Sequence, residues 1–159
     1  MTLAIRRVVT GHDATGNAMV IADGLSYNQP NRRPGTEASV IWTTEGFPVS
    51  NDGYADGAQR EVGTTHANGT VFRIVSFGPG NSPRMHRTDS IDYAVVMSGE
   101  IDMVLDNSRT IHLKAGDVVV QRGTVHNWQN TGAEPCVIAF VLVDAKPVEA
   151  GGKVLHAEG

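Results

Sequence analysis

Apolar and polar residues alternate along much of the chain, and glycine, proline, asparagine and aspartate interrupt the runs at intervals typical of short strands joined by turns. The pattern predicts strands at residues 5–11, 17–24, 39–44, 70–77, 91–97, 100–106, 110–115, 117–122 and 136–144. Within 100–106, Ile101, Met103 and Leu105 alternate with polar residues, as expected of a strand with one packed and one solvated face. The chain is therefore expected to be all-β.

The segments beside these strands indicate the architecture. Residues 45–69 are polar and predict a surface loop with at most one helical turn, which could cover the mouth of a barrel. The run 136–144 is apolar at consecutive positions, which favours a central strand. Residues 145–159 are compatible with a packed arm or with disorder. Because an all-β chain must protect its sheet edges, we expect a closed barrel or a two-sheet jelly roll with a pocket at one end.

Composition narrows the class of protein. With 159 residues, 40% of them apolar, residues 1–159 are expected to form one domain. The formal charge of -4, without any run rich in lysine and arginine, disfavours a nucleic-acid partner. We see neither a secretory signal nor a membrane span, and the single Cys136 is expected to be a buried structural thiol. These features predict a cytoplasmic protein with no membrane partner.

Two clusters of glycine and polar residues carry the candidate chemistry. The first consists of Gly80, His86, Thr88, Asp92 and Gly99. Its histidine and threonine stand two positions apart, so an extended chain would place them on the same face. The aspartate follows in the next predicted strand.

The second cluster consists of Gly116, Gly123, His126 and Asn130. Together the two clusters resemble the paired motifs of the cupin superfamily, small jelly-roll barrels that often hold a divalent metal ion. The resemblance implies a single cupin jelly-roll β-barrel. It also implies a homodimer, since cupins often pair through sheet faces and exchanged N-terminal strands.

The resemblance covers roughly residues 70–143, which would form the barrel core. Residues 1–69 would supply N-terminal strands and loops, and residues 144–159 a C-terminal tail. The sequence departs from the family pattern at two ligand positions. Thr88 stands where a second histidine is expected, and Asp92 stands where the family has glutamate.

His86, Asp92 and His126 are the predicted metal ligands and the predicted catalytic residues. If both histidine strands face the barrel interior, the two imidazoles could meet there, joined by the carboxylate. Two histidines and one carboxylate suit Fe(II), and also Zn, Mn or Ni. Alternatively, the histidines are neutral, hydrogen-bonded barrel residues that act without a metal, with Asp92 orienting a ring. No organic cofactor is expected.

Three further residues are predicted to line the substrate pocket. Arg84 could bind a substrate carboxylate through its fork of donors, or pair with a surface acid. Thr88 is a poor metal ligand, so its position would be left to water or substrate. Trp128 shares the parity of His126 and could form an apolar wall or simply pack in the core. Tyr93, next to an inward Asp92, should point outward.

The predicted function is that of a small-molecule enzyme with lyase-type chemistry. Decarboxylation, dehydration or isomerisation of a small oxo or hydroxy acid would use either a reduced metal site or acid–base groups. A non-catalytic binding or sensing module is one alternative, because the missing histidine could mark a pocket that has lost its chemistry. An iron-dependent dioxygenase is another, because cupins include such enzymes.

Overall fold

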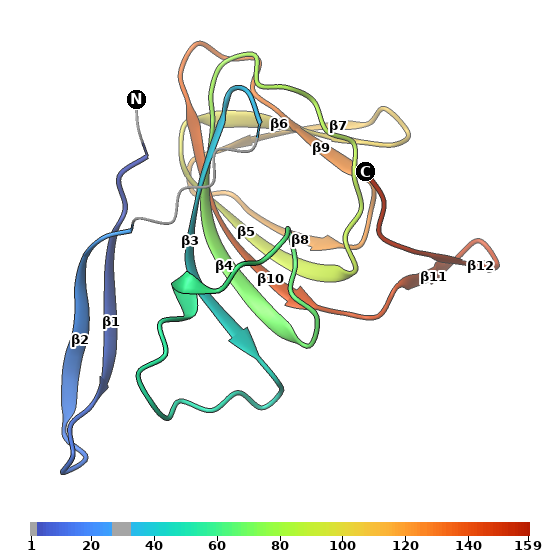
Figure 1. Ribbon diagram of the computed structural model, residues 1–159. Helices are drawn as coiled ribbons and strands as arrows, with labels where there is room; N and C mark the ends of the chain where they lie inside the picture. The colour runs from blue at the N-terminus through green and yellow to red at the C-terminus, as the bar shows by residue number, and fades with distance from the viewer. Residues whose placement is uncertain (1–2, 27–32) are drawn as a thin grey trace.

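The computed structural model describes residues 3–26 and 33–159 and consists almost entirely of β-strands (Figure 1). The strands are β1 (Arg6–His12), β2 (Ala18–Leu25), β3 (Thr36–Glu45), β4 (Gly69–Phe77), β5 (Ser90–Ser98), β6 (Glu100–Leu105), β7 (Thr110–Lys114), β8 (Val118–Arg122), β9 (His126–Gln129), β10 (Cys136–Asp144), β11 (Val148–Ala150) and β12 (Lys153–Leu155). Every strand predicted from the alternation is present. The predicted ranges do not include β9, β11 and β12, because strands of three or four residues are too short for a period of two to show.

Two antiparallel sheets face each other across the core. One has the strand order β3-β4-β10-β5-β8, and the other has the order β7-β6-β9. In Figure 1 the three-stranded sheet lies across the top of the five-stranded sheet. Both sheets contribute to one cluster of buried residues: Val40, Val71, Val75, Phe77, Ala94, Val96, Ile101, Met103, Leu113, Trp128, Cys136, Ile138, Phe140 and Leu142. The predicted all-β jelly roll is confirmed in its two-sheet form.

Strand β10 is the centre of the larger sheet, as its apolar sequence predicts. Its residues Ile138, Phe140 and Leu142 are buried in the core. Phe140 pairs with Arg73 on β4, and Leu142 pairs with Asp92 on β5. The central strand therefore holds an arginine and an aspartate on its two sides, both among the inward-facing residues.

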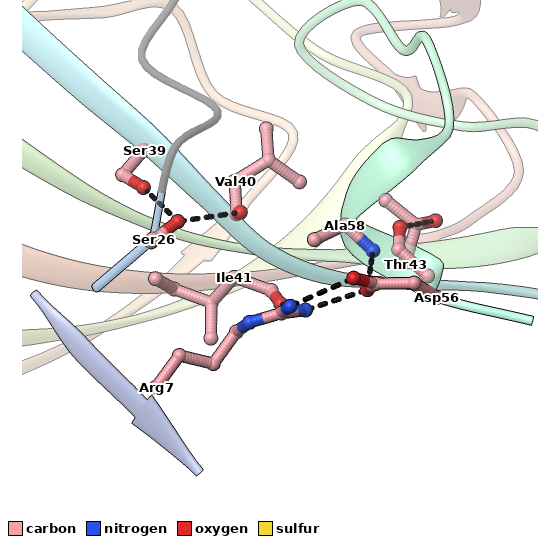
Figure 2. Close-up of polar contacts among 9 residues, drawn as sticks. Arg7, Ser26, Ser39, Val40, Ile41, Thr43, Asp56 and Ala58 are labelled. Atoms are coloured by element: carbon pink, nitrogen blue, oxygen red, sulfur yellow. Dashed lines mark hydrogen bonds and ion pairs between the residues drawn. The ribbon is translucent and has the colours of Figure 1, made fainter. Parts of the chain in front are cut away.

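The β1–β2 hairpin extends away from the two sheets and is anchored by an ion pair (Figure 1). The guanidinium of Arg7 donates to both carboxylate oxygens of Asp56 at 2.6 and 2.7 Å (Figure 2). Asp56 also accepts a hydrogen bond from the backbone N–H of Ala58, at the start of the 3-10 turn η1 (Gly57–Gln59). The Arg7 guanidinium holds the pKa of the Asp56 carboxyl low, at about 2. A second contact joins the hydroxyls of Ser26 and Ser39 at 2.6 Å.

The polar segment between β3 and β4 is a loop with one helical turn, η1, as predicted. The Thr43 hydroxyl of β3 donates to the backbone oxygen of Gly57 at 2.6 Å and holds this turn against the sheet. Residues 58–64 contribute to the lining of the internal cavity. The loop thus covers the cavity, as the sequence suggested.

The C-terminal segment packs as an arm and is not left without structure. It forms the β11–β12 hairpin and then returns to the chain near the first motif. Arg87 and Glu158 exchange two backbone hydrogen bonds of 2.9 and 3.0 Å, and their side chains form an ion pair at 3.4 Å. Within the described ranges, no helix has the length and apolar character required to cross a membrane.

Candidate functional site

A cavity of about 850 Å³ lies between the sheets and under the loop that carries η1. Its apolar lining includes Ala38, Val40, Ala58, Val62, Val75, Phe77, Trp128, Phe140 and Leu142. Its polar lining includes Arg33, Thr36, Gln59, Arg60, Glu61, Thr64, Arg73, Arg84, His86, Asp92 and His126. Volumes of about 300–1,000 Å³ are typical of small-molecule sites. The cavity therefore has the size and mixed lining of such a site.

His86 and His126 lie side by side in this cavity. Each donates its backbone N–H to the carbonyl oxygen of the other, at 3.0 and 2.9 Å. Because directly opposed residues of an antiparallel pair put their side chains on the same face, the two rings meet, with centroids 4.4 Å apart. The structure thus brings the histidines of the two sequence motifs into contact.

Backbone carbonyls fix the tautomer of both rings. Nδ1 of His86 lies 3.0 Å from the carbonyl oxygen of Arg84, and Nδ1 of His126 lies 3.0 Å from that of Thr124. A carbonyl oxygen only accepts, so each Nδ1 carries the proton and each Nε2 keeps its lone pair. Burial, and then the neighbouring His126, lower the pKa of His86 to about 4, and burial also lowers the pKa of His126. Both rings are neutral at pH 7 and can accept a proton at Nε2.

Asp92 lies on β5 and is 5% exposed. Its Oδ1 accepts a hydrogen bond of 2.5 Å from the Ser90 hydroxyl, which also lies 2.8 Å from the hydroxyl oxygen of Thr88. Burial raises the pKa of Asp92 to about 6, against the opposing effects of Ser90 and the nearby Arg73. A carboxyl group with this pKa exchanges a proton close to neutral pH.

The predicted metal site is formed only in part. The two imidazoles are adjacent, yet the described residues contain no group of three or more histidine, cysteine, aspartate or glutamate side chains arranged to hold a metal ion. Asp92 is held by Ser90 instead. Two imidazole nitrogens do not make the set of three or four protein ligands expected for a catalytic metal. We therefore assign no chemical step to a metal here, and metal binding at His86, Asp92 and His126 stays a prediction.

The three residues predicted for the pocket have different positions. Arg84 and Trp128 line the cavity. Trp128 packs edge-on against His126, Phe140 and, in a tilted arrangement, Phe77, so it joins the histidine pair to the apolar wall. Thr88 is buried but is not part of the lining; its hydroxyl lies 2.8 Å from that of Ser90. Its predicted contact with substrate therefore gains no support from the structure.

Arginines provide most of the charge in the cavity, and sequence reasoning found only one of them. Arg33, Arg60, Arg73 and Arg84 line it together with the acids Glu61 and Asp92. Arg60 pairs with Glu45 at 2.7 Å outside the lining. Arg73 has a recognisable signal, because it shares the inward parity of Val71 and Val75 on β4. Arg33 has none, since it lies in a segment that the sequence marks only as a turn.

Several other residues hold the site in place. The side chain of Asn127 accepts from the backbone N–H of Arg84 at 2.8 Å, and Asn81 donates to the carbonyl oxygen of Trp128 at 2.9 Å. Asn130, a motif residue, is 1% exposed and donates to the carbonyl oxygens of Phe77 and Glu134. These amides connect the chain before His86 to strand β9. The asparagines thus have a structural role, and they fix the register in which His86 pairs with His126.

Residues given no catalytic role behave mostly as expected. Tyr93 points outward and is exposed, and Cys136 is fully buried, with burial raising the pKa of its thiol to about 11. His12, His112 and His156 are exposed, and His112 pairs with Asp102 at 2.9 Å. His66 is half-buried in the cavity loop, where the backbone of Gly69 passes close to its ring.

The fold and the cavity together define a two-sheet jelly-roll protein with an internal site of small-molecule size. Residues 73–143 match the Cupin_2 family, described as a cupin domain. The chain is 39% identical over 157 residues to phomopsin biosynthesis cluster protein C' of Diaporthe leptostromiformis, with 94% of this chain and 83% of that protein covered. It is 32% identical over 157 residues to the cupin-domain-containing oxidoreductase fogC of Aspergillus ruber, covering 94% of this chain and 77% of that protein. The chain belongs to the cupin superfamily.

Among solved structures, the chain is similar to an uncharacterized conserved protein with a double-stranded beta-helix domain from Klebsiella pneumoniae. That likeness has 27% sequence identity and a TM-score of 0.44, and it covers 57% of this chain and 76% of the other. The structural neighbours also include a predicted oxalate decarboxylase of Thermotoga maritima, at 21% identity and a TM-score of 0.40, covering 46% of this chain and 64% of that one.

Proposed function

We propose that this cupin is a small-molecule enzyme that moves a proton on an organic acid, in a lyase or isomerase reaction. The observation that carries the proposal is the histidine pair. Two imidazoles in contact each hold Nδ1–H against a backbone carbonyl and keep an Nε2 lone pair, inside a cavity of about 850 Å³. This is the arrangement of a general base with a fixed tautomer.

The step assigned to the pair is abstraction of a proton from a carbon next to a carbonyl or carboxyl group. Nε2 of His86 or His126 takes the proton, and the electron pair of the broken C–H bond forms an enol or enolate. That electron pair then either returns to a neighbouring carbon that is reprotonated, which is isomerisation, or expels a leaving group from the β-carbon, which is elimination. The imidazolium or the Asp92 carboxyl group supplies the proton for the second half of the reaction.

The short distance between the two rings supports binding of one proton at a time by the pair. Two imidazolium ions with centroids 4.4 Å apart would repel each other, so the pair accepts only one proton readily. The second ring stays neutral and can accept a hydrogen bond from the substrate or from the first ring. His86 and His126 are therefore expected to act as a unit, and loss of either should remove most of the activity.

An oxidoreductase is the second candidate, because several relatives, including those of Aspergillus ruber and Hypocrea virens, are named cupin-domain-containing oxidoreductases. Such a reaction would need a bound redox group, and a metal held by the two imidazoles could supply it. A binding module without catalysis would also use this cavity. The experiment must separate these three cases.

The test is proton exchange in D₂O, followed by proton NMR with a panel of oxo, hydroxy and unsaturated acids, on protein of measured metal content. Enzymatic loss of a signal next to a carbonyl, or formation of an elimination product, without consumption of O₂, supports the proposal. The same result after chelation would assign the step to the side chains alone. Consumption of O₂ that depends on a bound metal would replace the proposal with the oxidoreductase, and saturable binding without exchange would replace it with the binding module.

A further inference from the structure

We propose that Arg33 and Arg84 form a carboxylate-binding pair, and that the substrate is an organic acid with an apolar body about as large as an aromatic ring or more. The inference rests on the proposed function only in taking this cavity as the reaction site. It names the class of substrate, which the histidine pair alone does not. It also moves away from the short oxo or hydroxy acids that the sequence suggested.

The charge of the cavity is opposite to that of the chain. The whole sequence has 13 lysines and arginines against 17 acids, but the lining has four arginines against the two acids Glu61 and Asp92. Arg60 is paired with Glu45, and Arg73 lies near Asp92. Arg33 and Arg84 remain, and among residues 3–26 and 33–159 neither forms an ion pair with an aspartate or glutamate side chain.

Arg33 and Arg84 line the same cavity as the two histidines. Arg33 is half-buried and is near enough to Arg84 for their charges to interact, and both act on His86. Partly buried positive charges that repel one another are stabilised by an anion placed between them. A carboxylate fits because its two oxygens match the planar fork of an arginine.

The backbone fixes both arginines in place. Arg33 begins a turn in which Thr36 N–H donates to the Arg33 carbonyl oxygen at 3.1 Å, with Pro34 and Gly35 at the central positions. Gly35 has φ of 72°, which favours glycine, and an added Cβ would lie 2.8 Å from the Cα of Asn81. The turn is thus locked against the segment that leads to Arg84.

Arg84 is held from several sides but keeps donors to spare. Its backbone N–H is bound by Asn127, and its guanidinium reaches the Thr64 hydroxyl at 3.4 Å and the backbone oxygen of Gly159 at 2.7 Å. An arginine has five N–H donors. The remaining donors can bind a carboxylate without breaking these contacts, in the same cavity as the imidazole pair.

The remainder of the cavity requires an apolar body on the ligand. Trp128, Phe77 and Phe140 form an aromatic cluster that contacts His126, with ring centroids 5.4 to 6.4 Å apart. Acetate or propionate would leave most of the 850 Å³ unfilled and would make few contacts with the apolar lining. An aryl or long alkyl group would displace that water and gain the free energy of apolar burial.

Calorimetry with three probes tests the inference without requiring turnover. The probes are 3-phenylpropionate, the uncharged 3-phenylpropanamide of the same shape, and propionate. We expect 3-phenylpropionate to bind at least about tenfold more tightly than either of the others, because only it has both the charge and the ring. Arg33→Met and Arg84→Met should each weaken its binding by about tenfold, whereas Arg109→Met, at an exposed turn, should not.

Each outcome has a definite meaning. Equal binding of the acid and the amide, or binding unaffected by Arg33→Met and Arg84→Met, would overturn the carboxylate pair. Propionate binding as tightly as 3-phenylpropionate would overturn the apolar body. The comparison of the acid with the amide uses the unaltered protein, so it holds even if a variant folds poorly. Selective binding of the acid without any proton exchange would support the carboxylate pair and contradict the proposed reaction. The two proposals can therefore fail separately.

Discussion

His86 and His126 exchange both backbone hydrogen bonds although the bridge between them is isolated from the named strand ladders. This single bridge decides the chemistry of the site, because it places two imidazoles on the same face with their ring centroids 4.4 Å apart. A shift of one residue in either segment would turn one ring out of the cavity. The amides of Asn81 and Asn127 hold the segment before His86 against β9 and oppose such a shift.

The first prediction concerns loss of either imidazole. His86→Gln and His126→Gln should each lower the rate of proton exchange on a substrate acid by about 100-fold or more, which is typical for removal of a general base. The double variant should be little worse than either single one, because the two rings share one proton. His112→Gln, at an exposed histidine, is the matched control and should retain the rate. Independent, multiplicative losses would contradict a coupled pair.

The second prediction concerns the opposite response of His86 and Asp92 to acid. The pKa of His86 in the folded chain, about 4, lies below its ordinary value of 6.5, so the unfolded chain binds the proton first and stability falls as the pH drops from about 6.5 to 4. The folded pKa of Asp92, about 6, lies above its ordinary 3.8, so the folded chain binds the proton first and stability rises as the pH drops from about 6 to 4. The two contributions offset each other.

A variant that lacks either His86 or Asp92 should show the effect of the remaining group on the pH dependence of the unfolding free energy. Asp92→Asn is expected to lose about 1–2 kcal/mol more of its unfolding free energy than the wild type between about pH 6.5 and 4.5, as measured by urea denaturation. His86→Gln should change in the opposite direction, because only His126, whose pKa burial also lowers, then opposes the contribution of Asp92. Carboxylates such as Asp13 and Asp56, with pKa values of about 2, titrate below this window. Parallel pH profiles for all three proteins would refute the assignment.

The strands were predictable because alternation is a local property, whereas the meeting of the histidines was predictable only on the condition that both segments face the barrel interior. Alternation places Arg84 and His86 on one face, and the resemblance to the paired cupin motifs implies that His126 belongs to the same site. The same reasoning could have assigned the contact of Ser90 with Asp92, since these residues share a face of one extended strand. That contact engages the carboxylate predicted to bind a metal, and it depends on a serine that the motif comparison passes over.

The arginines were harder to predict, for two different physical reasons. The sequence shows Arg73 as a charged residue at an inward position of a strand. It does not show which residues surround Arg73 in the fold, so its place in the cavity could not be inferred. Arg33 enters the cavity only because its turn docks on Asn81, a contact between segments far apart in the chain. Long-range docking of loops leaves no periodic signal, so a search of the sequence cannot find such residues.

The third prediction concerns the oligomeric state. The homodimer implied by the cupin resemblance stays a prediction, and the outer face of β5 and β8 offers a surface for it. This face exposes Tyr93, Val95, Met97, Val118 and Val120, with Tyr93 directly opposite Val120 and Val95 opposite Val118. Contiguous exposed apolar residues are typical of interaction sites. Light scattering after size exclusion at several concentrations should give a dimer for the wild type and a monomer for Val120→Glu, and a wild-type monomer at every concentration would contradict it.

The fourth prediction concerns the ion pair that connects the β1–β2 hairpin to the cavity loop. The guanidinium of Arg7 donates to both carboxylate oxygens of Asp56. Asp56 also caps the 3-10 turn whose residues Ala58 and Gln59 line the cavity. Arg7→Met should therefore loosen this loop, with an unfolding free energy lower by about 1 kcal/mol and faster proteolysis within residues 46–68. Ligand binding should weaken several-fold, because the loop then forms the wall of the cavity for a smaller fraction of the time.

Arg6→Met is the matched control, since the guanidinium of Arg6 also donates to both carboxylate oxygens of an aspartate, Asp23, but entirely within the exposed hairpin. If both variants have the same effect on proteolysis and binding, the hairpin does not support the loop through Arg7.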